Sequence, residues 1–284
     1  MARPIRTRLT GIGDAMSGST GRPGAERETK MTQRVMITAG ASGIGWAIAR
    51  AFADSGAKVH ICDVDERALR TVAQTYPQIV GRKVDLGNET AVDKWFDEAL
   101  GDLGGLDVLI NNAGTKGPTG HVEELKLQDW RDCLGICLDA QFLCARRAAP
   151  VMKAQSSGSI VNISSTAGLY GYGLRTPYAA AKWAVIGFTK SLAVELGPHS
   201  VRANTICPGS VNGARMQQVI KAEAESRGVA IELVQEEYVQ SQSIKRFVEP
   251  EEIADMCLFL ASPAAKMVTG QAIAVDGHTE TFHI

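Results

Sequence analysis

Two absences limit the classes of protein to which this chain can belong. No apolar run approaches the ~20 residues that a membrane-spanning helix needs. The 30 basic and 31 acidic residues nearly cancel, so charge gives no argument for binding to nucleic acid or to a membrane surface. With 45% hydrophobic and 21% charged residues, the composition is that of a soluble globular protein. We therefore expect neither nucleic acid nor a membrane among its partners.

The six cysteines lack the CxxC pairs of a zinc site, and most of them lie within apolar stretches. This usage indicates a reducing, cytoplasmic setting. Cys133, Cys137 and Cys144 share one face of an expected helix, which leaves two interpretations open. They are either ligands for a soft metal or small buried residues where helices pack. We favour packing and expect no metal site.

Residues 1–30 differ from the rest of the chain. They are rich in Gly, Ser, Thr, Arg and Pro and show no apolar periodicity, which predicts a disordered N-terminal extension. They lack the apolar core of a secretory signal, whereas a transit-like extension stays open. Met31 comes directly before the first expected strand and is a candidate for the biological start. A single folded domain is therefore expected over residues 31–284.

From residue 34 on, short apolar segments alternate with helical patterns. Short, nearly all-apolar strands between helices are typical of a parallel sheet covered on both faces. The sequence thus predicts one doubly wound α/β domain, a Rossmann fold with a seven-stranded parallel sheet in three layers. A ligand is expected at the carboxyl ends of the strands. Strands are expected at 34–38, 58–63, 79–85, 105–111, 158–164, 201–207 and 271–276, and helices at 43–55, 65–75, 89–101, 124–155, 177–197 and 250–261.

After the first expected strand, a glycine-rich turn runs straight into a helix. Glycines at such a turn let a pyrophosphate approach the backbone, and the helix N-terminus supplies N–H donors. Asp63 ends the second strand, where a carboxylate accepts both hydroxyls of the adenosine ribose and repels a 2′-phosphate. Ser42 offers no cation for that phosphate, so the sequence favours NAD over NADP. The turn residues expected to bind the cofactor are Gly40, Ser42, Gly43, Ile44 and Gly45.

The run from Tyr178 to Lys182 carries the expected chemistry. The Ala-rich segment around it predicts a helix, on which positions i and i+4 share a face. A lysine ammonium there favours the ionised form of the phenol, so Tyr178 can act as a general base or acid. Ser165 ends the preceding strand segment and is expected to steady the reacting oxygen by a hydrogen bond. A Tyr–Lys pair at this spacing without such neighbours is usually a surface pair with no function.

Together with three further segments, in this order along the chain, these residues resemble the short-chain dehydrogenase/reductase family of the type with a single Rossmann domain. The further segments are Asp85-Leu86, Asn111 to Gly114, and Pro208-Gly209. The resemblance implies adenine contacts by Asp85 and Leu86 and an adenosine side lined by Asn112, Ala113 and Gly114. It also implies that Lys182 holds the nicotinamide ribose and that Val211 faces the nicotinamide carboxamide.

Three positions depart from the pattern of this family. Ala39 stands where glycine is usual, and we expect Gly40 directly after it to keep the turn intact. Cys137 stands where a helical asparagine usually supports a proton-relay water, although its backbone carbonyl is still available for that water. Gly213 replaces a threonine that is expected shortly after Pro208-Gly209.

Residues 213–245 are expected to form a lid or substrate segment of two short amphipathic helices. Arg215, Gln217 and Gln218 face either the substrate or the solvent on this pattern. The loop after Gly114 offers Lys116, Thr119 and His121 as further candidates. His278 near the C-terminus either touches the active site of a neighbouring subunit or is an inert residue of the tail.

The favoured function is an NAD-dependent oxidoreductase that interconverts a secondary alcohol and a ketone. The alternatives are an NAD-binding regulatory protein without turnover and a lyase-like relative without hydride transfer. The regulatory protein is disfavoured because Ser165, Tyr178 and Lys182 are all present. The lyase-like relative is disfavoured because Lys182 and Asp63 are retained. We also expect a homotetramer or homodimer, because the resembled family forms its main subunit contact with the helices expected at 124–155 and 177–197. Those helices carry many apolar and small residues: Ala140, Cys144, Ala145, Ala184, Val185 and Phe188.

Overall fold

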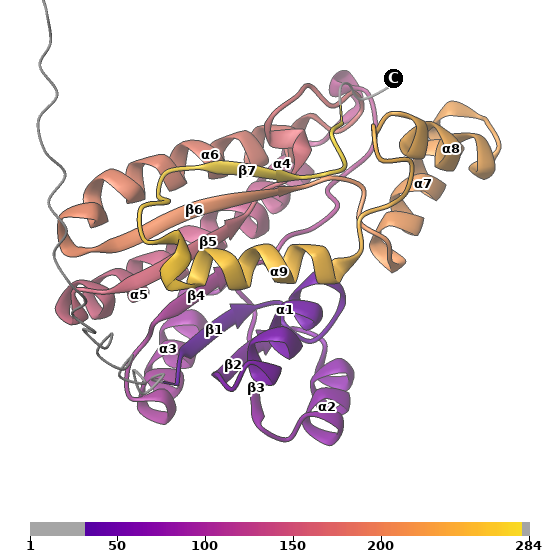
Figure 1. Ribbon diagram of the computed structural model, residues 1–284. Coiled ribbons are helices and arrows are strands. Elements are labelled where there is room, and N and C mark those ends of the chain that lie inside the picture. The colour runs from indigo at the N-terminus through magenta and orange to yellow at the C-terminus, as the bar shows by residue number, and fades with distance from the viewer. Residues whose placement is uncertain (1–31, 280–284) are drawn as a thin grey trace, which may run out of the picture. The chain divides into compact units, whose positions relative to one another are not determined.

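The computed structural model describes residues 32–279, and its seven strands form one parallel sheet (Figure 1). The predictions for residues 1–30, for Met31 and for residues 280–284 lie outside the described residues. Each strand begins and ends within a few residues of its expected range. The strands are β1 (Arg34–Thr38), β2 (Lys58–Asp63), β3 (Ile79–Lys83), β4 (Val108–Asn111), β5 (Gly158–Ile163), β6 (Val201–Pro208) and β7 (Ala272–Val275).

The strand order is β3-β2-β1-β4-β5-β6-β7, and every neighbouring pair is parallel. β1 pairs with β2 on one side and with β4 on the other, so that Val35 lies opposite both Val59 and Val108. The chain winds outward in both directions from this point, and the connections after β1 and β4 therefore leave a crevice at the carboxyl edge. The prediction of a doubly wound, seven-stranded α/β fold is confirmed.

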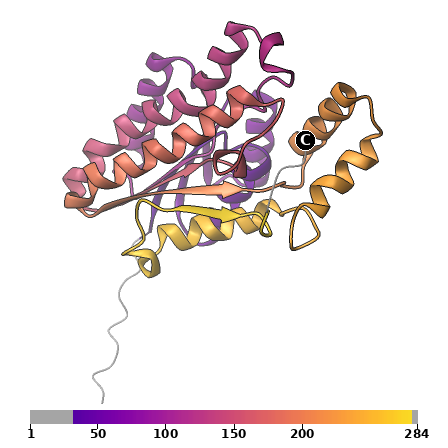
Figure 2. The same cartoon turned by 90° about the horizontal axis from the view of Figure 1, so that it is seen from above.

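Helices cover both faces of the sheet (Figures 1 and 2). On one face α1 (Gly43–Asp54), α2 (Glu66–Thr75) and α9 (Pro250–Ala261) share a core with the strands that contains Phe52 and Leu260. On the other face α3 (Glu89–Leu103), α5 (Ala140–Gln155) and α6 (Thr176–Leu196) bury Trp95 and Met152 in a second core. Because the sheet is buried on both faces, its strands need apolar residues at successive positions.

The single helix expected at 124–155 is wrong in detail. The segment contains α4 (Leu127–Leu134), a π-helical turn at Gly135–Asp139, and then α5. A π-turn widens the helix by one residue, and such turns occur mostly at functional sites. The turn contains Cys137, which is fully buried, and Ile136, which lines the cavity described below. Apolar residues continue at helical spacing through the turn, so periodicity alone does not reveal it.

The segment after β6 forms two helices, α7 (Ala214–Arg227) and α8 (Ile231–Gln240), beyond the carboxyl end of the sheet (Figure 2). Gly228 ends α7 in a left-handed conformation with φ 66°, which glycine adopts without strain. The two helices bury Ile220, Val234 and Tyr238 in a small core of their own, separate from the two cores on the sheet. The two helices therefore pack as a unit of their own at this end of the sheet.

The six cysteines are all buried and free of disulfide bonds. No group of three or more His, Cys, Asp or Glu side chains within residues 32–279 is arranged to hold a metal ion. None of the helices in that part of the chain is long and apolar enough to cross a membrane.

Candidate active site

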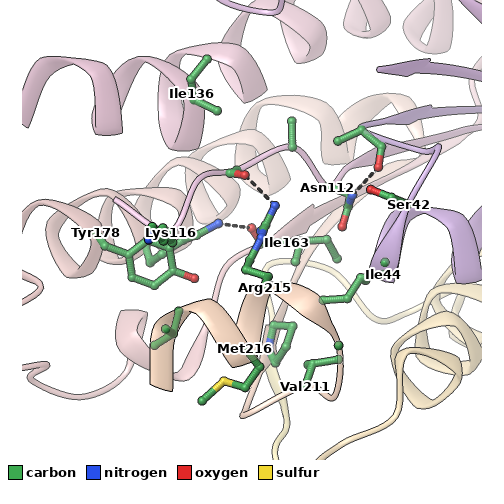
Figure 3. A pocket seen from close by; sticks show the side chains of 18 of the residues that line it. Ser42, Ile44, Asn112, Lys116, Ile136, Ile163, Tyr178, Val211, Arg215 and Met216 are labelled. Atoms are coloured by element: carbon green, nitrogen blue, oxygen red, sulfur yellow. Dashed lines mark hydrogen bonds between the residues drawn. The ribbon is translucent and has the colours of Figure 1, made fainter. Parts of the chain in front are cut away.

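A cavity of about 570 Å³ opens at the carboxyl ends of the strands, between the sheet and α7 (Figure 3). It extends from the end of β2, through the β1–α1 turn and the end of β4, to the start of α6. Most of the residues predicted from sequence to bind cofactor or catalyse line it: Ser42, Gly43, Ile44, Asp63, Asp85, Leu86, Asn112, Ala113, Gly114, Tyr178, Lys182 and Val211. The structure thus brings together segments that are far apart in the chain.

Gly40 and Gly45 are predicted site residues that do not line the cavity but shape its wall. A Cβ on Gly45 would lie 2.0 Å from the carbonyl oxygen of Ala39, and a Cβ on Gly40 would lie 2.7 Å from the side chain of Ile61. Glycine is therefore required at both positions because the backbone of the turn is packed tightly. Gly43 has φ 52° at the first residue of α1, where the helix N-terminus faces the cavity.

Ala39, and not Gly40, adopts the left-handed backbone conformation in this turn. Its φ is 50°, in the left-handed region that costs a residue with a Cβ about 1–2 kcal/mol. Gly40 has no positive φ and is needed for close packing instead. The left-handed residue of the turn is therefore Ala39 and not Gly40, and the missing glycine at position 39 leaves strain in the glycine-rich turn.

Two carboxylates lie at the end of the cavity formed by β2 and β3. Asp63 is 8% exposed and accepts hydrogen bonds from the backbone N–H groups of Ala41 and Asp65, both at 3.1 Å. Asp85 accepts from the N–H of Gly87 at 2.9 Å. The bond from Ala41 connects the end of β2 to the glycine-rich turn and fixes the carboxylate of Asp63 beside it.

Hydrogen bonds join the ends of β1 and β4. The side-chain amide of Asn112 donates to the carbonyls of Thr38 and Ala39, both at 3.1 Å. The hydroxyl of Thr38 accepts from the N–H groups of Asn112 and Ala113 at 2.9 and 3.0 Å. These four bonds tie the connections after β1 and β4 together at the point where the strand order reverses, which fixes one wall of the crevice.

Lys182 is unusual among the charged residues of the site, because the residue is only 3% exposed. Its ammonium nitrogen Nζ donates to the carbonyl oxygen of Ile163, the last residue of β5, at 2.9 Å. The same atom lies 5.6 Å from the centre of the ring of Tyr178, one helical turn earlier. Within residues 32–279 the structure shows no ion pair to this ammonium. A buried cation whose charge is not balanced by a carboxylate indicates a site for a polar ligand.

Ser165 does not line the cavity, whereas its neighbour Ser164 does. The hydroxyl of Ser165 caps the short 3₁₀ turn Thr166–Gly168 by accepting from the N–H of Ala167 at 3.1 Å. Ser164 is buried and donates to the backbone carbonyl of Lys182 at 2.7 Å, which connects the end of β5 to α6. The catalytic role of Ser165 therefore stays a prediction, and Ser164 is a positioning residue that the sequence did not reveal.

Cys137 lies next to Tyr178 and Lys182. Its sulfur accepts from the N–H of Thr115 at 3.5 Å, and its carbonyl already accepts from the buried side chain of Gln141 at 3.2 Å. A hydrogen bond with Cys133 lowers the pKa of the Cys137 thiol, and the nearby charge of Lys182 acts in the same direction. The carbonyl of Cys137, which we expected to hold a relay water, thus already accepts a hydrogen bond from Gln141, one helical turn later.

The lining side chains that the sequence did not single out for the site include Tyr172, Arg175 and Tyr238. The hydroxyls of Tyr172 and Tyr238 are hydrogen-bonded to each other, and Tyr238 donates to Glu223 of α7 at 2.7 Å. Burial raises the pKa of the Tyr238 phenol, so it remains protonated. Arg175 could have been predicted as a site residue only from its position in the sequence, three residues before Tyr178.

The other candidates divide between the cavity and the surface. Lys116 and Arg215 line the cavity, and the guanidinium of Arg215 crosses to the carbonyl of Gly114 at 2.8 Å (Figure 3). Thr119, His121, Gln217 and Gln218 are not among the lining residues. His278 bonds to Ser243 at 2.7 Å instead of facing the cavity.

Comparison with known proteins agrees with this geometry. The family model described as Enoyl-(Acyl carrier protein) reductase matches residues 38–278. A trans-4-hydroxycyclohexanecarboxylate dehydrogenase of Sinomonas cyclohexanicum is 37% identical, over 87% of this chain and 93% of the relative. The fold and these matches define an α/β oxidoreductase that acts on alcohols or ketones.

Two solved structures are similar over nearly the whole described part. NAD+-bound xylitol dehydrogenase has a TM-score of 0.83 and 26% identity, covering 87% of this chain and 99% of its own. Actinorhodin polyketide ketoreductase with NADPH has a TM-score of 0.83 and 31% identity, covering 87% and 96%. The chain belongs to the short-chain dehydrogenase/reductase family, whose dehydrogenases bind nicotinamide cofactors.

The left-handed Ala39 leads to a prediction about stability. We expect Ala39→Gly to raise the free energy of unfolding by about 1 kcal/mol, because glycine adopts φ 50° without the clash of a Cβ. Denaturant unfolding at equilibrium measures it. Ala41→Gly in the same turn is the matched control and should lower stability by about 0.5–1 kcal/mol. Equal losses in both variants would show that residue 39 is not strained.

Proposed function

We propose that the protein is an NAD-dependent oxidoreductase that interconverts a secondary alcohol and a ketone, with Tyr178 as the residue that takes up and returns the proton. The observation that carries the proposal is the position of Lys182. Its buried ammonium is bonded to Ile163 and lies beside the ring of Tyr178, in the same cavity that Asp63 lines at the other end. This arrangement combines a charged anchor for a cofactor with a phenol at one reaction centre.

The residues present fit a nicotinamide dinucleotide. Asp63 at the end of β2 is placed to accept from the hydroxyls of the adenosine ribose, and the N-terminus of α1 is placed to donate to the pyrophosphate. Close packing at Gly45 keeps that backbone free of side chains. Lys182, at the opposite end, is placed to hold the nicotinamide ribose. The cofactor in this proposal is NAD, and residues 31–284 act as one catalytic domain.

The chemistry divides between the cofactor and the chain. The nicotinamide, when bound, supplies the acceptor for the hydride of the alcohol carbon. The oxygen of Tyr178 takes the proton of the alcohol, and the charge of Lys182 stabilises the phenolate that accepts it. The hydroxyl of Ser165 accepts a bond from Ala167, so its own proton is available to hold the reacting oxygen in line. The helices α7 and α8 serve as a lid that covers the substrate.

The preference for NAD can be tested by binding. The wild-type protein should bind NAD at least about tenfold more tightly than NADP, because Asp63 and a 2′-phosphate repel each other. Of the cationic residues that line the described cavity, none comes from the turns after β1 and β2. Calorimetric titration with both cofactors measures the preference.

Asp63→Ala combined with Ser42→Arg should shift this preference toward NADP. Asp65→Ala, which removes a carboxylate two residues away and outside the cavity lining, is the matched control and should keep it. Equal affinity of the wild-type protein for the two cofactors would contradict the assignment.

The second prediction concerns turnover. Tyr178→Phe should lower turnover by about 10²–10⁴-fold and leave NAD affinity nearly unchanged, since general acid–base catalysis typically contributes that much. The assay follows the absorbance of reduced nicotinamide with a panel of hydroxy acids, polyols, sugars and steroids. Hydroxy acids come first because the 37% identical relative is named for one.

Tyr76→Phe at the end of α2 removes a phenol hydroxyl away from the cavity and should have no effect. Near-normal turnover by Tyr178→Phe would rule out the proposed base. Binding of NAD without turnover on any member of the panel would favour the regulatory protein instead.

The third prediction concerns assembly and location. We propose a cytoplasmic homotetramer or homodimer formed through α5 and α6. Ala140, Cys144, Ala145 and Val185 cannot contribute, because the fold buries them within the subunit. Ala184 and Phe188 are half-buried, and the large apolar residues exposed on these helices are Phe142, Trp183 and Val194. Trp183→Glu with Phe142→Glu should give a monomer by light scattering at micromolar concentration, and a wild-type monomer would contradict the proposal.

A further inference from the structure

The two ends of the cavity carry opposite charge. The acidic lining residues, Asp63 and Asp85, lie at the ends of β2 and β3. The basic lining residues Lys116, Arg175, Lys182 and Arg215 surround the end that holds Tyr178. No acidic side chain among the described residues lines that end. Lys182 has a place in the proposed mechanism, whereas the other three cations have none in it.

Arg175 is the most informative of these cations. The residue is only 4% exposed, and its Nε has no hydrogen-bond partner within residues 32–279. The guanidinium carbon lies 5.1 Å from the ring centre of Tyr172 and 5.0 Å from that of Tyr178. Its Nη2 donates to the backbone carbonyl of Lys116, and no carboxylate in the described part pairs with it. Burial without a counter-charge is costly, and an unused donor adds to that cost.

We infer that the substrate carries a carboxylate and that Arg175 binds it, which makes this residue the determinant of specificity. The inference rests on the proposed function, because it places the carboxylate beside the phenol of Tyr178. A guanidinium presents a planar set of donors that matches a carboxylate, and the two tyrosine rings hold it in one orientation. Since it packs directly against the ring of the proposed base, a small hydroxy acid is long enough to reach both groups.

A purely structural role for Arg175 makes a different prediction. If the guanidinium only supported the tyrosine rings and the loop at Lys116, its loss would slow the enzyme equally on every substrate. If it binds a carboxylate, its loss slows the enzyme far more on substrates that have a carboxylate than on substrates that do not. The two roles are therefore separated by comparing each hydroxy acid with its uncharged methyl ester.

The experiment uses the full chain with saturating NAD and measures kcat/KM for 3-hydroxybutyrate and 4-hydroxycyclohexanecarboxylate and for their methyl esters. For whichever of the two acids is the better substrate, kcat/KM of the wild-type protein should be about 10- to 100-fold higher than for the methyl ester of that acid. Arg175→Gln should remove this preference, because it should lower kcat/KM for the acid by about 10- to 100-fold more than for the ester. Arg175→Lys keeps the charge and should recover part of the preference. Lys221→Gln, which removes an exposed charge of α7 outside the cavity lining, is the matched control and should keep all of it.

A second arm does not need turnover. Calorimetric titration of the NAD-saturated protein with butyrate and butyramide should show tighter binding of butyrate, and Arg175→Gln should abolish the difference. Equal binding of the two by the wild-type protein, or equal loss of kcat/KM on acid and ester in Arg175→Gln, would overturn the inference. Oxidation of uncharged alcohols in preference to every acid would overturn it while leaving the proposed function intact. Failure of the proposed function would appear separately, as butyrate binding without turnover of any alcohol.

Discussion

The site depends on one hydrogen bond, from the ammonium of Lys182 to the carbonyl of Ile163. A lysine side chain is long and flexible, and burying its charge is unfavourable unless its donors are used. The carbonyl at the end of β5 fixes this ammonium beside the ring of Tyr178 and leaves its other donors free for a ligand. The strand that ends at Ile163 therefore determines where charge is available in the cavity.

The surrounding packing keeps that geometry fixed. Ser164 bonds to the backbone of α6 at Lys182, so the strand and the helix cannot slide past each other. The four bonds between the ends of β1 and β4 fix the opposite wall of the crevice. Both walls belong to the two large cores, whereas α7 and α8 pack on a core of their own. Rigid walls below a separately packed helix pair suit an enzyme that must admit and release two ligands.

Features that depend on local sequence could be predicted, and those that depend on tertiary contacts could not. All-apolar strands follow from burial on both faces, and the spacing of Tyr178 and Lys182 follows from one turn of helix. Whether Ser164 or Ser165 lines the cavity depends on the direction in which the chain turns after β5, and the local sequence does not determine that direction. The π-turn at Cys137 leaves the apolar pattern of the sequence intact. An arginine usually faces solvent, so the burial of Arg175 is visible only once Tyr172 and Tyr178 surround it.

The central claim is that Lys182 acts on the reaction through Tyr178. It is tested most directly by the rate of alcohol oxidation in a single turnover at saturating NAD, measured for Lys182→Met, Tyr178→Phe and the double variant. Groups that act as a unit give losses that do not add. We expect Lys182→Met to slow the wild-type enzyme by at least about tenfold but to change the rate by less than about threefold in the Tyr178→Phe background. Losses that multiply in the double variant would contradict it.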